Sequence, residues 1–229
     1  MRILAIRGEN LASLQQPFCV DFRTEPLRDA GLYAITGPTG AGKSTILDAL
    51  CVALYNQIPR LRGEKGEGVL DASGDTIKPT DPVNLLRRGA SSCSASVDFV
   101  GIDGVEYSAS WGVRRAKNQP DGKLQHATMS VCRLHDKQEL ASSTTECRRL
   151  VEEKLGLNYA QFTRTVLLAQ REFDNFLNAD SNEKATLLER ITGSEIYAQI
   201  SEQIHLLYGA AKEAYLRKKE ELAPLLSVT

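Results

Sequence analysis

Long apolar runs are scarce in this chain of 229 residues. The longest uncharged apolar run spans residues 49–55, whereas a membrane span needs about 20 such residues. The N-terminal stretch MRILAIRG is also too short in apolar residues for a signal peptide. We therefore expect no membrane segment and a cytoplasmic location.

Paired cysteines are missing as well. The five cysteines are odd in number and form no Cys-x-x-Cys; they are Cys19, Cys51, Cys93, Cys132 and Cys147. This pattern indicates a reduced chain without a zinc cluster. The three histidines, His126, His135 and His205, stand apart in the sequence and are interpreted as surface or packing residues.

The chain also lacks an excess of charge of either sign. The chain has 28 Lys and Arg against 29 Asp and Glu, a net charge of −1, so composition alone predicts no nucleic-acid partner. Basic clusters at 114–117 and 217–219 are typical of solvated surface. Apolar residues make up 42% and charged residues 25%, which excludes a disordered chain and fits one large or two small domains.

The first 140 residues are predicted to form strands around one helix. The expected strands span residues 3–6, 18–22, 32–36, 94–102, 105–113 and 127–134, and the expected helix spans residues 44–55. Residues 57–82 show little periodicity and are interpreted as a long loop or irregular insertion. Asp103 and Gly104 separate two alternating runs, which is a strong hairpin signal.

The remainder is predicted to be helical. Expected helices span residues 144–155, 159–169 and 182–191, with Gly156 as a C-cap and Asn182 as an N-cap. Beyond Gly193, apolar residues step by 4, 4, 3 and 4 positions: Ile196, Ile200, Ile204, Leu207 and Ala211. This spacing fits a heptad seam of a coiled coil, and it fits an ordinary amphipathic terminal helix equally well.

The sharpest motif is a complete G-x-x-x-x-G-K-[ST]. It comprises Gly37, Pro38, Thr39, Gly40, Ala41, Gly42, Lys43 and Ser44, with Thr45 following. A strand is expected before it and a helix after it, so backbone N–H groups can cradle phosphates at a helix N-terminus. Lys43 is expected to reach the β- and γ-phosphates, and the Ser44 hydroxyl to bind Mg²⁺. The motif predicts a nucleoside-triphosphate site.

The second half of such a site is missing. A self-sufficient P-loop enzyme needs a strand that ends in an aspartate holding the magnesium. The one candidate, Asp103, follows an apolar run interrupted by Gly101 and is better explained as the hairpin turn. An N-K-x-D guanine motif is absent, and the D-x-x-G match from Asp71 to Gly74 is too short to carry weight. We expect nucleotide binding without a complete catalytic site.

Several blocks of the sequence match a known family. The chain closely resembles the N-terminal ATPase segment of the bacterial SbcC family, the large subunits of SbcCD nucleases, within the SMC-like branch of the ABC ATPases. The similar blocks are MRILAIRGENLASL at the start, YAITGPTGAGKSTILDALCVALY (33–55), RRAKNQPDGKLQ (114–125), FTRTVLLAQREFDNFLNA (162–179) and LLERITGSEIYAQIS (187–201).

The resemblance implies a split ATPase. In that family a long antiparallel coiled coil leads to a C-terminal half with the signature motif, the Walker B aspartate and the catalytic glutamate. None of these is present here, so we interpret the chain as an N-terminal fragment that hydrolyses ATP negligibly alone. The implied fold is an α/β ABC-type P-loop ATPase head lobe, a mixed sheet with an antiparallel portion plus a helical lobe. Residues 1–193 are the N-terminal head half (1–140 the sheet lobe, 141–193 the helical segment), and 194–229 begin the coiled coil.

The resemblance also assigns individual residues. Gln170 corresponds to the Q-loop glutamine, which contacts Mg²⁺ or the attacking water, and with Lys43 it forms the expected catalytic set. Asn10 and Ser13 match a first loop that approaches the nucleotide phosphates. Ala12 stands where some relatives carry an arginine, so a charge contact from this loop is not predicted. Arg87 and Arg88 are interpreted as facing DNA, nucleotide or solvent.

The implied function is ATP-driven gating of a nuclease that cleaves DNA ends and hairpins, at the nucleoid in the cytoplasm. ATP with Mg²⁺ would be sandwiched in a homodimer of heads, each completed by its own C-terminal half. The implied partners are an SbcD-type nuclease subunit and double-stranded DNA ends. The alternatives are an SMC-like DNA clamp without a nuclease partner and a stand-alone P-loop kinase, which would need a complete magnesium site here.

Overall fold

A computed structural model of the chain describes residues 2–30, 33–61, 68–165, 180 and 195–226. The chain divides into two compact units, residues 1–174 and 175–229. Among the described residues, no helix has both the length and the apolar character needed to cross a membrane.

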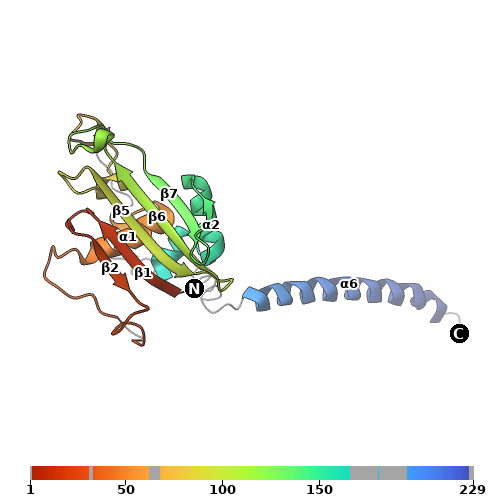
Figure 1. Ribbon diagram of the computed structural model, residues 1–229. Coiled ribbons are helices and arrows are strands. Elements are labelled where there is room, and N and C mark those ends of the chain that lie inside the picture. The colour runs from red at the N-terminus through yellow and green to blue at the C-terminus, as the bar shows by residue number, and fades with distance from the viewer. Residues whose placement is uncertain (1, 31–32, 62–67, 166–179, 181–194, 227–229) are drawn as a thin grey trace. The chain divides into compact units, whose positions relative to one another are not determined.

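The first unit is built on a six-stranded sheet with the order β2-β1-β5-β6-β7-β8 (Figure 1). The strands are β1 (Arg2–Glu9), β2 (Phe18–Asp21), β5 (Ser92–Val100), β6 (Glu106–Arg114), β7 (Thr128–Arg133) and β8 (Glu139–Ala141). Each neighbouring pair in this sheet is antiparallel. The α/β class with an antiparallel portion is therefore confirmed.

The predicted hairpin is confirmed between β5 and β6. Gly104 adopts a left-handed φ of 75°, and the Asp103 carboxylate accepts a hydrogen bond from the backbone N–H of Val105 at 3.1 Å. Side chains of β6 alternate between the core and the opposite face, with Tyr107 and Trp111 in the core. Asp103 thus serves the turn, as expected from its place between the two alternating runs.

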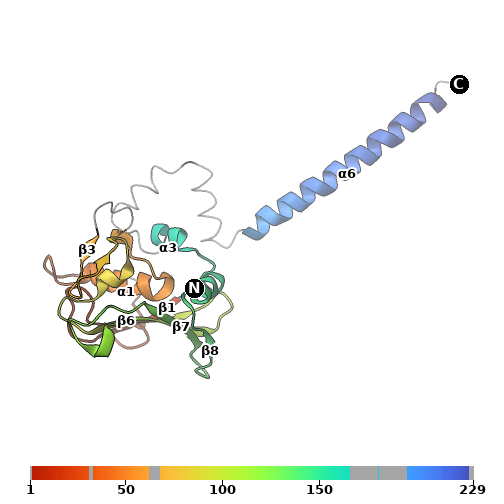
Figure 2. The ribbon, with the colours of Figure 1, turned by 90° about the horizontal axis from the view of Figure 1, so that it is seen from above.

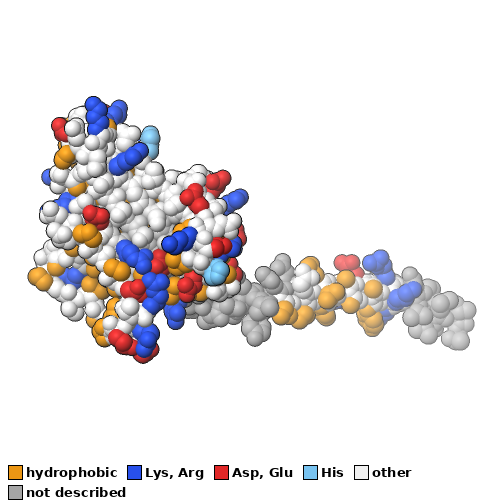
Figure 3. Space-filling model, viewed as in Figure 1, with side chains coloured by type: hydrophobic (Ala, Val, Ile, Leu, Met, Phe, Trp, Pro, Cys, Tyr) orange, Lys and Arg blue, Asp and Glu red, His pale blue; other side chains and the backbone are white. Residues whose placement is uncertain are grey.

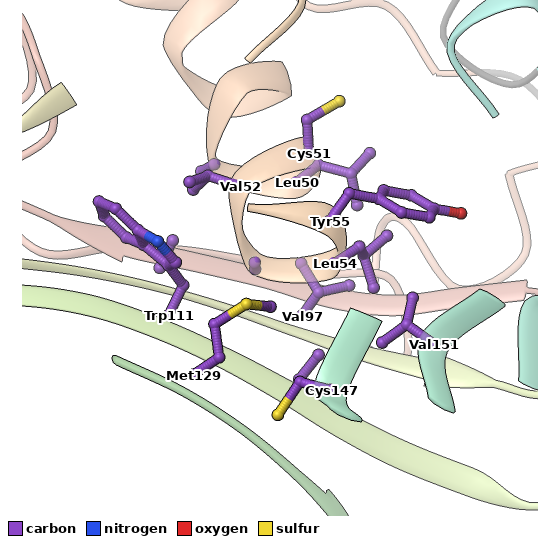
Figure 4. Packing of buried hydrophobic residues seen from close by; sticks show 14 of the residues in the cluster. Leu50, Cys51, Val52, Leu54, Tyr55, Val97, Trp111, Met129, Cys147 and Val151 are labelled. Carbon is purple, nitrogen blue, oxygen red and sulfur yellow. The ribbon is translucent and has the colours of Figure 1, made fainter. Parts of the chain in front are cut away.

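Helix α1 (Lys43–Tyr55) packs against β1, β5 and β6, and α2 (Thr144–Leu155) packs beside it over β7 (Figures 1 and 2). The second half of α1 is buried throughout. Its side chains meet Val97, Trp111 and Met129 of the sheet in one continuous apolar core (Figure 4). Burial of this helix fixes the direction in which its N-terminus points, and that N-terminus is the end of the P-loop.

The sheet face opposite α1 is lined by small polar side chains. The residues of β5 and β6 that alternate with the core positions include Ser94, Ser96, Ser108 and Ser110. Figure 3 shows this surface largely without charged side chains at its centre, with both basic and acidic side chains around it. Only the opposite face of the sheet therefore contributes to the apolar core.

The strand expected at residues 32–36 is wrong for the part that the structure describes. Residues 33–36 form no strand, and Tyr33 and Ile35 are 44% and 50% exposed. A strand needs a neighbour that accepts and donates its backbone hydrogen bonds. No described strand lies alongside this segment, so its apolar composition alone does not make it a buried strand.

The segment expected to be irregular holds short regular elements. A two-stranded hairpin joins β3 (Val69–Leu70) to β4 (Thr76–Ile77), between the 3₁₀ turns η1 (Pro59–Leu61) and η2 (Pro82–Leu85). Elements of two to four residues are too short to show a periodicity. The edge strand β8 escaped prediction for the same reason.

The predicted α2 is confirmed at both ends. Ser143 caps its N-terminus by accepting from the Glu146 N–H at 3.3 Å, and Gly156 ends it with a φ of 70°. Helix α3 (Tyr159–Thr165) begins where predicted; the rest of 159–169 and the helix expected at 182–191 lie outside the described residues.

In the second unit the structure describes α6 (Glu195–Leu226), one continuous helix. Apolar side chains on it are exposed, among them Ile204 at 60% and Leu207 at 69%. The helix expected beyond residue 193 is confirmed as a helix, and its pairing in a coiled coil stays a prediction.

Candidate nucleotide-binding site

The P-loop connects residues 33–36 to α1, and its glycines are required by the backbone. Gly40 and Gly42 have φ of 84° and 88°, in the left-handed region that disfavours other residues. At Gly42 a Cβ atom would also lie 2.5 Å from the Leu14 Cδ2. The loop can therefore keep this shape only with glycine at its last position before the helix.

The loop offers unpaired donors at the helix N-terminus. In the described part of the chain, the N–H groups of Gly40, Gly42, Lys43 and Ser44 donate to no acceptor, while Ala41 closes a turn through the Pro38 carbonyl at 3.2 Å. Four free N–H groups at the positive end of a helix dipole form a binding site for phosphate. This donor set fits the β- and γ-phosphates of a nucleotide.

The Lys43 side chain spans the loop. Its Nζ donates hydrogen bonds to the carbonyl oxygens of Gly37 at 2.7 Å and Pro38 at 2.8 Å. Both contacts are exposed, so the ammonium group lies on the open side of the loop. An ammonium has three donors, and one remains for a phosphate oxygen.

The two hydroxyl residues in the first turn of α1 differ in exposure. Ser44 is exposed, whereas Thr45 is buried and its N–H donates to the Gly42 carbonyl at 3.0 Å. Ser44 is therefore accessible at the start of α1, as a residue whose hydroxyl is to bind Mg²⁺ must be. Thr45 contributes to the helix start and packing.

Asp48 lies one turn further along α1 and was not singled out in the sequence. Its side chain is 5% exposed, and its Oδ2 lies 3.0 Å from the Nε of Arg60. Burial raises the pKa of Asp48 to about 6, against the opposing effect of Arg60. The sequence feature that could have identified Asp48 is its acidic side chain within an otherwise apolar face of the helix.

The loop of residues 10–14 meets the P-loop at Gly42. The contact is made by Leu14, whose side chain fills the space next to Gly42. Asn10 and Ala12 hold left-handed φ angles of 53° and 45°. The sequence did not single out Leu14, and the approach of Asn10 and Ser13 to nucleotide phosphates stays a prediction.

Arg87 is placed against this loop. Its guanidinium NH1 donates to the carbonyl oxygens of Ala12 at 3.2 Å and Ser13 at 3.1 Å. Arg88 is exposed. Arg87 therefore lies against the loop of residues 10–14, and whether it also faces DNA or nucleotide stays open. Gln170 lies outside the described residues.

Asp71, the first residue of the D-x-x-G match, is a structural residue. Both of its carboxylate oxygens accept from Arg115, at 2.6 and 2.7 Å, and both side chains are less than 10% exposed. The Arg115 guanidinium holds the pKa of Asp71 well below its usual range. This buried pair ties the hairpin of β3 and β4 to the end of β6.

A glycine loop with free N–H groups at a helix N-terminus, crossed by a lysine and followed by an exposed serine, defines a P-loop nucleotide-binding domain. A family model described as an AAA domain matches residues 5–226. The chain therefore belongs to the AAA domain family.

Its curated relatives include components of nucleases. The SbcC component of the nuclease SbcCD from Rhodobacter capsulatus is 51% identical over 206 residues, which cover 90% of this chain and 17% of that protein. The SbcC component from Pseudomonas aeruginosa is 48% identical over 221 residues, covering 96% and 18%. A probable DNA double-strand break repair Rad50 ATPase of Aquifex aeolicus is 29% identical over 226 residues, covering 97% and 20%.

These similarities confirm the expected resemblance to the N-terminal segment of SbcC. The chain spans less than one fifth of the length of the two SbcC relatives. Among solved structures, one of the recombination mediator protein RecF with ATP is 17% identical with a TM-score of 0.41, covering 64% of this chain and 29% of that one.

Proposed function

We propose that this chain is the ATP-binding N-terminal half of a split ATPase head. The observation that carries the proposal is the P-loop itself: free N–H groups at the start of α1, crossed by Lys43 with one donor to spare. The similarity to SbcC proteins over nearly the whole chain supports the assignment of this site to that type of ATPase.

Two features support a site that is completed by other residues. Asp103, the one candidate for the magnesium-holding aspartate, is bound to Val105, Tyr107 and Lys154 at the hairpin turn. The segment directly before the P-loop leaves Tyr33 and Ile35 exposed. An exposed apolar segment that pairs with no strand in the described part of the chain suits pairing with a strand from a C-terminal half.

In this proposal residues 1–193 form the head half and 194–229 begin the coiled coil. Bound Mg²⁺ would offset the negative charge of the phosphates. The Ser44 hydroxyl and Gln170 would hold it, and the loop of Asn10 and Ser13 would approach the phosphates. Lys43 would neutralise charge on the transferred phosphate, and Gln170 would orient the attacking water.

The completed protein would act in a nuclease complex. Two heads would enclose ATP between them, and their engagement would control access of double-stranded DNA ends and hairpins to an SbcD-type nuclease subunit. Its action would then take place at the nucleoid in the cytoplasm. The proposal draws on the names of the relatives, which are parts of a nuclease.

The test uses the protein completed with its C-terminal half and reconstituted with the nuclease subunit. Gln170→Ala is expected to keep ATP affinity within a few fold, because the P-loop supplies most of the ground-state contacts. It should lose most ATP hydrolysis and the ATP-dependent change in DNA-end cleavage. Gln138→Ala, at an exposed position in the turn between β7 and β8, is the matched control.

Three outcomes would contradict the proposal. Normal hydrolysis and gating in Gln170→Ala would remove the Q-loop assignment. Failure of the completed protein to associate with the nuclease subunit would favour the DNA clamp. Turnover above ~0.1 s⁻¹ by the purified 229-residue chain, well below typical enzyme rates, would show a self-sufficient enzyme.

A further inference from the structure

We infer that Arg87 is a positioning residue of the nucleotide site, which holds the loop of residues 10–14 in place beside the P-loop. The inference rests on the proposed nucleotide-binding function of that P-loop. Arg87 stands far from the loop in sequence but makes three hydrogen bonds to it. Its backbone N–H donates to Asn10 O at 2.9 Å, and its NH1 to Ala12 O and Ser13 O.

The loop needs such support because its backbone is strained. Asn10 and Ala12 are non-glycine residues with left-handed φ angles, a conformation that persists only where the surroundings impose it. Within the described residues, Arg87 is the sole donor to the carbonyls of Ala12 and Ser13. Backbone pairing also supports the loop, since the Ala12 N–H donates to Leu85 O at 2.8 Å.

The loop reaches the P-loop through Leu14. The Leu14 N–H donates to Leu11 O at 2.8 Å, and Leu11 is fully buried, so one end of the loop is anchored in the core. The Leu14 side chain contacts Gly42, the residue that caps α1. A change in the carbonyl positions of Ala12 and Ser13 is therefore transmitted to the point where the phosphate-binding helix begins.

The bonds of Arg87 distinguish positioning from direct contact. Its NH1 already serves two carbonyl oxygens of the loop, whereas the side chain of neighbouring Arg88 is exposed. If the affinity for nucleotide depended only on positive charge in this region, removing either arginine should weaken binding to a similar extent. If it depends on the hydrogen bonds to the loop, only the removal of Arg87 should weaken binding.

The experiment compares Arg87→Met, Arg88→Met and Arg133→Met in the 229-residue chain. Methionine keeps an apolar stem and removes the donors. Arg133 is a surface arginine bonded to Asp136 in the turn after β7 and serves as the distant control. By calorimetry with ATP and Mg²⁺, Arg87→Met should bind about tenfold more weakly, and both controls within twofold of the parent chain. Arg87→Lys, which keeps a donor, should recover part of the loss.

A second measurement needs no nucleotide. Hydrogen exchange of the Ala12 and Leu14 amides should accelerate in Arg87→Met and stay unchanged in the two controls, with exchange in β6 unaltered in all variants. If the parent chain binds no ATP, the proposed function fails, while the exchange result still reports whether Arg87 holds the loop.

Three results would overturn the inference: unchanged ATP affinity in Arg87→Met, an equal loss in Arg88→Met, or unchanged exchange of the loop amides.

Discussion

The Nζ of Lys43 lies 2.7 Å from the carbonyl oxygen of Gly37, the residue that begins the P-loop. Lys43 stands at the end of the loop, so this hydrogen bond joins the two ends and holds the loop closed around its free N–H groups. The lysine thereby has two tasks: it shapes the loop, and its third donor remains for a phosphate oxygen.

The glycines of the loop should differ in their tolerance to alanine. Gly42→Ala combines a left-handed φ with a close approach to Leu14, and it should lower the free energy of unfolding by roughly 2–4 kcal/mol. Gly40→Ala has the same kind of φ but no atom within 4 Å of its Cβ, so its loss should stay near 1 kcal/mol. Urea unfolding of both variants measures the difference, and equal losses would contradict the contact with Leu14.

The pair of Asp71 and Arg115 should matter for stability and leave nucleotide binding alone. Asp71→Asn leaves a guanidinium buried without its partner charge and should lower the free energy of unfolding by about 3 kcal/mol. Asp75→Asn, in an exposed pair 3.9 Å from Lys123, should change it by less than about 0.5 kcal/mol. Weaker ATP binding by folded Asp71→Asn would show that Asp71 serves the nucleotide site.

Asp71 also predicts an acid-sensitive contribution. Its folded pKa lies below the unfolded value, so its stabilisation is present above the unfolded pKa and is lost as the pH falls toward the folded one. The stability difference between the parent chain and Asp71→Asn should therefore shrink below pH 4. Unfolding curves at pH 3.5 and pH 7 measure it; a difference that does not shrink would contradict the pairing.

Asp48 predicts the opposite pH dependence. Burial raises its folded pKa to about 6, above the unfolded value near 4, so the folded state holds its proton more tightly. Its ionisation then costs stability increasingly as the pH rises from 4 to above 6. Asp48→Asn, which cannot ionise, should gain about 1–3 kcal/mol relative to the parent chain over that interval. Urea unfolding at pH 4.5 and pH 7.5 tests this, and a gain that is the same at both values contradicts it.

The parts of the fold that the sequence predicted are those with strong local signals. The turn at Asp103 and Gly104, the start of α1 and both ends of α2 each depend on residues within a few positions of one another. The strand expected at 32–36 depends on a neighbour far away in the chain, and no local pattern reveals whether such a neighbour exists.

In the candidate site, too, features set by neighbouring residues were predicted and contacts between distant residues were not. The P-loop is read from consecutive residues, so its glycines, Lys43 and Ser44 were predicted together. The contact of Leu14 with Gly42 and the bonds of Arg87 to the loop of Ala12 join residues far apart in sequence. An ordinary leucine and one of two adjacent arginines carry no signal of such contacts until the chain is folded.

The central claim is that the P-loop of this chain binds ATP with Mg²⁺, and equilibrium calorimetry of the 229-residue chain against Lys43→Ala tests it most directly. The lysine bonds are exposed, so the variant should keep its fold, with a loss of no more than about 1 kcal/mol in the free energy of unfolding. We predict weak but measurable ATP binding by the parent chain and at least a tenfold loss in Lys43→Ala, about 1.4 kcal/mol. A folded parent chain that binds no ATP, or a folded variant that binds it with unchanged affinity, would contradict the claim.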